Sequence, residues 1–309
     1  MSDSLERTEK VSVETFAKKL QLEIIYDSGK EICLTTDNVS RPGLLLSGYY
    51  DYFGNERVQV IGQTEYSYLN TLDTPIREQR FDRLCAGNIP CLIFTRDLKI
   101  EPYVAKHAKK YGVPVFLSKW NTTTLVSRLN SFLADLLAPQ TQLHAVLMDI
   151  YGVGVLIKGD SGIGKSETAL ELVKRGHRLV SDDVVLLKKV NEDIIGTSPE
   201  VIRHFMEVRG IGIIDIRSLY GASALQLDMR VELIVDLEKW DTSKQYERVG
   251  DKETFETILG VPISRYVIPV TPGRNMGIIL ETAAAAQRLR NLGYNAGAEL
   301  EKRLTKRRN

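Results

Sequence analysis

The segment from Gly159 to Ser166, GDSGIGKS, combines the residue types that bind phosphate groups in proteins. It fits the pattern of a glycine, four residues, a second glycine, a lysine, and a serine or threonine. Glycines let the backbone turn its N–H groups inward around phosphate oxygens, beside a helix N-terminus that favours anions. Lys165 would reach the outer phosphates, and the Ser166 hydroxyl would bind Mg²⁺. The residues expected around the phosphates are Gly159, Asp160, Ser161, Gly162, Ile163, Gly164, Lys165 and Ser166.

The residues on either side predict the strand and the helix that such a loop needs. Residues 153–158, VGVLIK, are a β-branched apolar run typical of a strand. Residues 167–175 carry apolar side chains at helical spacing, namely Ala169, Leu172 and Val173. A flexible Gly/Ser loop is the alternative, but the order of strand, loop and helix favours phosphate binding.

Carboxylates that could act with the loop occur at three places. Asp182 and Asp183 interrupt an apolar run, and such a pair needs a cation, a metal or solvent nearby. The Mg²⁺ expected at Ser166 would be a candidate partner. Residues 231–236, VELIVD, look more like the usual strand that ends in a metal-binding Asp, and residues 212–215, GIID, are a weaker version. A strand-terminal Asp is often a helix cap or turn former, so spacing does not choose among the three.

Other polar residues are ambiguous when considered individually. Residues 143–148, the turn at 149–152 and the following strand predict a hairpin, which places His144 on the strand antiparallel to the one before the phosphate loop. A structural role for His144 is favoured on this basis. Residues 207–215, EVRGIGIID, fit either a close approach of backbone to a ligand or a bulged strand. Arg248 and Arg274 lie in turn-rich segments, where arginine is usually solvated but can also bind transferring phosphates.

Length, charge and apolar patterning bound the class of protein. A chain of 309 residues predicts two domains, and the amphipathic helix expected at 122–137 stops at Ala138-Pro139, which gives domains 1–138 and 139–309. The net charge of +1 gives no global electrostatic reason to expect nucleic acid or an anionic membrane as partner. There is no apolar signal segment or membrane-length apolar run, and the three cysteines lack metal-ligand spacing. We therefore expect a soluble, cytoplasmic protein with reduced thiols.

The first domain is expected to be α/β, because strand-like runs alternate with helical stretches. Helices are predicted at residues 11–20 and 102–111, with His107 exposed on the second. No residue of this domain forms a recognisable catalytic constellation. The strand-like runs are residues 31–35, 43–47, 58–61, 91–95 and 113–117.

Three segments of the second domain closely resemble the bacterial HPr kinase/phosphorylase family. They are residues 144–183, from HAVLMDIYG to RLVSDD, residues 207–221, EVRGIGIIDIRSLYG, and residues 270–275, VTPGRN. The resemblance covers essentially all of residues 140–295. The departures are small: family members commonly have Gly in place of Ala145 and Phe-Gly-Ala-Gly at residues 220–223, and neither departure removes a charged group.

The resemblance implies an N-terminal α/β domain and a C-terminal P-loop kinase domain whose core is similar to phosphoenolpyruvate carboxykinase. It implies an enzyme that phosphorylates a serine of the phosphocarrier protein HPr with ATP or pyrophosphate. The same enzyme would remove the phosphoryl group by phosphorolysis, giving pyrophosphate, and would thereby regulate carbon metabolism and sugar uptake. Mg²⁺ and a homohexamer formed through the C-terminal domain are further implications.

The resemblance also implies roles for individual residues. Asp183 corresponds to the general base that takes the proton of the acceptor serine and returns it in phosphorolysis. The regions around Arg209 and Gly210, and around Arg274, match segments linked to catalysis, the last mainly to dephosphorylation. The remaining correspondences are the phosphate-loop lysine at Lys165, Mg²⁺ sites at Ser166 and Glu207, and catalytic positions at His144 and Arg248.

Two alternatives belong to other functional classes. A nucleotide-dependent, carboxykinase-like enzyme acting on a small acid would need a binuclear metal site rich in His and Lys, which four scattered histidines do not suggest. A non-catalytic ATP-binding regulator would use the phosphate loop without a general base.

Overall fold

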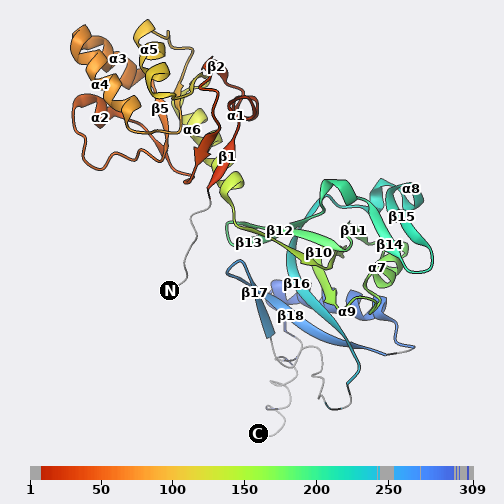
Figure 1. Ribbon diagram of the computed structural model, residues 1–309. Helices are drawn as coiled ribbons and strands as arrows, with labels where there is room; N and C mark the ends of the chain where they lie inside the picture. The colour runs from red at the N-terminus through yellow and green to blue at the C-terminus, as the bar shows by residue number, and fades with distance from the viewer. Residues whose placement is uncertain are drawn as a thin grey trace. The chain divides into compact units, whose positions relative to one another are not determined.

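The computed structural model describes residues 8–241, 243, 254–271, 273–295, 297, 299 and 305. Backbone contacts divide the chain into two compact units, Met1–Ala138 and Pro139–Asn309. Both units are built from helices and strands, so the predicted class of two α/β domains is confirmed (Figure 1). None of the described helices is both long enough and apolar enough to cross a membrane.

In its described part, the first unit has a five-stranded sheet in the order β2-β7-β6-β5-β4. β4 to β7 run parallel and β2 is antiparallel to β7. Helices α1 and α6 share one apolar core, and α2 to α5 share another. The strands are β1 (Glu9–Val11), which pairs with β3 (Ile32–Leu34), and β2 (Glu23–Tyr26), β4 (Val39–Ser40), β5 (Val58–Ile61), β6 (Leu92–Phe94) and β7 (Val115–Leu117). The helices are α1 (Val13–Leu20), α2 (Gly43–Ser47), α3 (Gln63–Thr71), α4 (Thr74–Ala86), α5 (Pro102–Tyr111) and α6 (Thr122–Leu137).

The strand predicted at residues 43–47 is wrong, because these residues form helix α2. Its two inward leucines, Leu45 and Leu46, are buried, and the helix ends at Gly48 in the left-handed conformation, with φ of 106°. A short apolar run does not distinguish a strand from a buried helix by periodicity alone. Here the prolyl N-cap at Pro42 and the glycine C-cap mark a helix.

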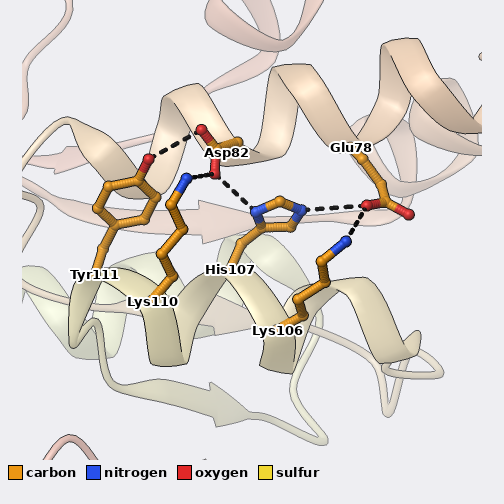
Figure 2. A network of polar contacts seen from close by, with 6 residues as sticks. All are labelled: Glu78, Asp82, Lys106, His107, Lys110 and Tyr111. Atoms are coloured by element: carbon orange, nitrogen blue, oxygen red, sulfur yellow. Dashed lines mark hydrogen bonds and ion pairs between the residues drawn. The ribbon is translucent and has the colours of Figure 1, made fainter.

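The expectation that His107 is exposed is also wrong, since its side chain lies in the interface between α4 and α5 (Figure 2). Its Nδ1 lies 2.9 Å from Asp82 Oδ1, and its Nε2 lies 3.6 Å from Glu78 Oε2. Lys110 also donates to Asp82, at 2.8 Å. This hydrogen bond is the main cause that lowers the pKa of Asp82 to about 2.

The second unit contains, in its described part, a nine-stranded sheet in the order β11-β9-β10-β16-β13-β12-β8, extended by β18 beside β16 and by β17 beside β18. β10, β16 and β18 are mutually parallel. The strands are β8 (Gln140–His144), β9 (Val146–Ile150), β10 (Val153–Gly159), β11 (Arg178–Ser181), β12 (Val184–Val190), β13 (Asp193–Thr197), β16 (Asp228–Lys239), β17 (Thr254–Ile258) and β18 (Val261–Val270).

This sheet is strongly curved. The chain passes directly from β8 to β9 and from β11 to β12, although these strands lie at opposite ends of the strand order. β12 therefore approaches β9, and one apolar core fills the concave side of the sheet. Helices α7 (Lys165–Lys174) and α9 (Met276–Asn291) pack with a second core. A hairpin of β14 (Phe205–Val208) and β15 (Gly212–Asp215) contacts α7 and leads into α8 (Ile216–Tyr220).

Candidate active site

The segment 159–166 forms a phosphate loop between β10 and α7. Gly159 has a φ of 144°, and a Cβ there would lie 2.5 Å from the carbonyl oxygen of Leu237 on β16, so the position requires glycine. Ile163 is buried in the core and fixes the middle of the loop. Gly164 is the N-cap of α7 with a φ of 103°. The loop therefore ends with the N-terminus of α7, where backbone N–H groups attract anions.

Two cationic side chains lie against this loop. The ammonium of Lys165, which is 7% exposed, donates to the carbonyl oxygens of Gly159 at 2.8 Å and of Asp160 at 3.2 Å. Arg209 lies close to Gly162, where a Cβ would come within 2.4 Å of the Arg209 Nη1. Arg209 belongs to the turn between β14 and β15, together with Gly210, whose φ is 84°. The hairpin thus brings the backbone of the loop and a guanidinium together.

Asp182 is the carboxylate that contacts Ser166. The Ser166 hydroxyl lies 2.9 Å from one Asp182 oxygen and 3.2 Å from the other. The backbone N–H of Glu207 on β14 also donates to this carboxylate, at 3.2 Å. Asp182 is buried, and burial is the main cause that raises its pKa. An ionised carboxylate held in this position favours a nearby cation.

Asp183 faces a different partner. Its Oδ1 lies 2.8 Å from the Nδ1 of His144, and both side chains are more than half exposed. The backbone N–H of Ala145 donates to the Asp183 carbonyl oxygen at 3.1 Å. Asp183 has a φ of 69°, which is uncommon for a residue other than glycine. An exposed carboxylate paired with a histidine can accept and return a proton.

The prediction that His144 lies on the strand antiparallel to the one before the phosphate loop is wrong. The hairpin exists, but it consists of β9 and β10, with the turn at Tyr151 and Gly152. His144 ends β8, which pairs with β12 and places His144 opposite Val184. The chain makes two adjacent crossings here, from β8 to β9 and from β11 to β12, and these crossings bring His144 to Asp183. Local hydrophobic periodicity carries no signal for such a crossing.

The two rival aspartates have other partners. Asp236, at the end of VELIVD, forms an ion pair with Arg265 on β18 and another with Lys158 at 3.5 Å. Asp215, at the end of GIID, caps α8 by accepting from the backbone N–H of Arg217 at 2.9 Å. Among the three candidates left open by spacing, the structure shows a hydrogen bond to the phosphate loop for Asp182, at Ser166, with Asp183 as its neighbour in the chain.

The remaining candidates lie near the same edge of the sheet or outside the described residues. Because β10, β16 and β18 are parallel, their carboxyl ends share one edge, where ligands of α/β sheets usually bind. Arg274 follows β18 at this edge, and its Nη1 donates to the Pro269 carbonyl oxygen at 3.3 Å. Glu207 is exposed on β14. Arg248 lies outside the described residues.

The oxygen donors at the loop suit a hard cation. The Ser166 hydroxyl and the Asp182 carboxylate are adjacent, and Mg²⁺ typically binds one or two protein oxygens together with waters and substrate phosphates. The site thus fits a metal that is bound together with phosphate.

Two family models match the chain, one over each unit. Residues 11–133 match the HPr Serine kinase N terminus, and residues 135–304 match the HPr Serine kinase C-terminal domain. A protein of Caldanaerobacter subterraneus subsp. tengcongensis named HPr kinase/phosphorylase is 47% identical over 96% of this chain and 98% of its own length. One of Alkaliphilus metalliredigens with the same name is 46% identical over 96% of each chain. The solved HPr(Ser) kinase/phosphatase of Coxiella burnetii is 36% identical, with a TM-score of 0.47, over 52% of this chain and 98% of that one.

Proposed function

The chain belongs to the HPr serine kinase family, and on this premise we propose that it phosphorylates a serine of HPr with ATP or pyrophosphate and removes the phosphoryl group by phosphorolysis. The observation that carries the proposal is the separation of Asp182 from Asp183. One carboxylate binds Ser166 of the phosphate loop, and its neighbour, paired with His144, stays exposed to an incoming hydroxyl.

In the kinase direction, the acceptor serine oxygen forms a bond to the terminal phosphorus of ATP while the bond to the bridging oxygen breaks. Asp183 accepts the hydroxyl proton, and ADP leaves. His144 holds the Asp183 carboxylate through the contact at 2.8 Å. Phosphoryl transfer depends mainly on alignment and charge neutralisation, and Lys165, Arg209 and Arg248 are the cations proposed for that task.

In the phosphorylase direction, an oxygen of inorganic phosphate attacks the phosphorus of phosphoserine. The bond to the serine oxygen breaks, this oxygen takes the proton from Asp183, and pyrophosphate leaves. One carboxylate can serve both directions by microscopic reversibility, if it starts ionised in one and protonated in the other. The resemblance assigns the segment around Arg274 mainly to this direction.

Mg²⁺ would be held by Ser166 and Asp182, with Glu207 as a further ligand, and would neutralise charge on the phosphates. We further propose that HPr is the acceptor, that the protein acts in the cytoplasm, and that it assembles as a homohexamer through the C-terminal domain. The names of the relatives support the kinase/phosphorylase and give no support to a carboxykinase-like enzyme or a non-catalytic regulator.

Replacing Asp183 by Asn tests the proposed general base. We expect transfer to HPr to fall by about 10²- to 10⁴-fold, because the amide does not accept the serine proton. Calorimetry should show that Mg·ATP still binds to this variant, because Asp183 pairs with His144 and not with a residue of the phosphate loop. Asp193→Asn is the matched control, since Asp193 is a half-exposed residue at the start of β13 in the same unit and pairs with Arg230 at 3.3 Å. Full transfer by the Asp183 variant would contradict the assignment.

A further inference from the structure

Helices α7 and α9 both begin at the proposed site. α7 starts at Lys165, directly after the phosphate loop, and α9 starts at Met276, directly after the segment that holds Arg274. Each helix follows one of the parallel strands, β10 or β18, whose carboxyl ends share one edge of the sheet. A shift of one helix along the other would therefore change the spacing between two cation-bearing segments of the site.

The contacts between the two helices fix their register. Glu281 on α9 accepts hydrogen bonds from Arg175, which lies 106 positions earlier at the end of α7. One helical turn nearer the site, Gly277 of α9 contacts Glu171 of α7, which also lies 106 positions earlier in the sequence. A Cβ at Gly277 would lie 2.8 Å from the Glu171 carboxylate. The two helices thus run in the same direction, in close contact at one turn and ion-paired at the next.

Glu281 is the centre of this second contact. Arg175 donates through Nε at 2.9 Å and through Nη2 at 2.5 Å, and the Nε2 of His177 lies 2.9 Å from the same carboxylate. The Glu281 side chain is 13% exposed and that of His177 is 5% exposed. The ring of Tyr151 packs edge-on against His177, with centroids 4.7 Å apart. The bidentate arginine gives the contact a defined geometry, which a single ion pair would lack.

We propose that Glu281 is a positioning residue that holds the phosphate loop and the Arg274 segment at the spacing that phosphorolysis requires. The inference rests on the proposed function. When ATP is the donor in the kinase direction, the reacting phosphates belong to one molecule that the whole nucleotide anchors. In the reverse direction, a free phosphate must be aligned with phosphoserine by the charged segments alone, so its rate depends more strongly on their spacing.

The test compares Glu281→Gln with Glu232→Gln in the full-length protein, with the ATP-dependent kinase rate and the phosphorylase rate both measured on HPr at saturating substrates. Glu232 is a matched control because it is 14% exposed and binds Asn291 of α9 and Arg230, so it ties α9 to the sheet and not to α7. We expect E281Q to lower the phosphorylase rate by about tenfold and the kinase rate by less than about twofold, since small misplacements cost large factors in transfer rates. E232Q should leave the ratio of the two rates unchanged.

If E281Q lowered both rates equally, or if its ratio of phosphorylase to kinase rate equalled that of E232Q, the inference would be overturned. Glu281 would then be a purely structural contact. Arg175→Gln removes the hydrogen bonds between Arg175 and Glu281 by changing the more exposed partner. This variant replaces E281Q in the test if E281Q does not fold. The charge exchange Arg175→Glu with Glu281→Arg should recover part of the phosphorylase rate lost in either single variant, as expected for directly coupled residues. A wild-type protein with neither activity would instead overturn the proposed function, and the inference with it.

Discussion

At the scale of single residues, the site depends on two adjacent aspartates with different environments. Asp182 is buried against Ser166 and the backbone N–H of Glu207, whereas Asp183 is exposed and paired with His144. The sequence identifies the pair as unusual, because two carboxylates interrupt an apolar run. It does not reveal which of the two faces the loop, since that depends on contacts with Ser166 and His144, which lie far away in the sequence. The family resemblance implied the general-base role of Asp183, and the structure adds the contact of Asp182 with Ser166.

The variant Asp182→Asn should have different effects on the stability of the metal-free protein and on its binding of Mg·ATP. Burial raises the pKa of Asp182, so its ionised form is costly in the metal-free protein, and the amide can still bond to Ser166 and to the Glu207 N–H. We expect the Tm without metal to stay the same or rise. We also expect loss of the stabilisation by Mg·ATP, which for a site with ligand at a hundred times its Kd is about 2.7 kcal/mol.

Thermal unfolding with and without Mg·ATP measures both effects of Asp182→Asn. Asp193→Asn again controls for the loss of a carboxylate and should keep the full shift with ligand. If Asp182→Asn also kept the full shift, Asp182 would not be a ligand of the metal.

At the scale of elements, local patterns predicted much of the secondary structure. The helix predicted at residues 11–20 is α1, with the Ser12 hydroxyl accepting from the Thr15 N–H, and the run 58–61 is β5. The wrong predictions concern strand pairing and helix packing, and the hydrophobic periodicity of one segment gives no information about either. His144 is held beside β12 by a pairing between distant residues, and His107 is buried because α5 packs against α4, where Asp82 contacts its ring.

The contact between α4 and α5 predicts a pH dependence of stability in the first unit (Figure 2). The pKa of Asp82 is lowered to about 2, chiefly by the hydrogen bond from Lys110, against an ordinary value of 3.8. A lowered carboxyl pKa contributes stability that is fully present above the unfolded value and is lost as pH falls through the folded value. Asp82→Asn should therefore lower the Tm near neutral pH, and the gap to wild type should close as the pH falls from about 4 towards about 2.

Thermal unfolding at a series of pH values checks this expectation for Asp82. Asp51→Asn, at an exposed position of the same unit, controls for the change in net charge. A gap between Asp82→Asn and wild type that stays constant over the same range would contradict the role assigned to the Lys110 hydrogen bond.

At the scale of the whole molecule, the chain joins two α/β units, and the phosphate loop and both site aspartates lie in the second. The boundary after Ala138 follows from a physical signal, because a helix rarely continues into a residue that precedes proline. The curved sheet of the second unit has no comparable signal. Its order results from crossings between strands that are far apart in the sequence, so a family resemblance or a structure is needed to find it.

The most direct test is one assay of both reactions on HPr. Purified full-length protein is incubated with HPr, Mg²⁺ and ATP, and the product is then transferred to inorganic phosphate without nucleotide. We predict that one serine of HPr is phosphorylated in the first step, and that the second step releases unmodified HPr with one pyrophosphate for each phosphoserine lost. If HPr gains no phosphoserine, and if phosphoserine-HPr supplied separately yields no pyrophosphate, the proposed function is wrong.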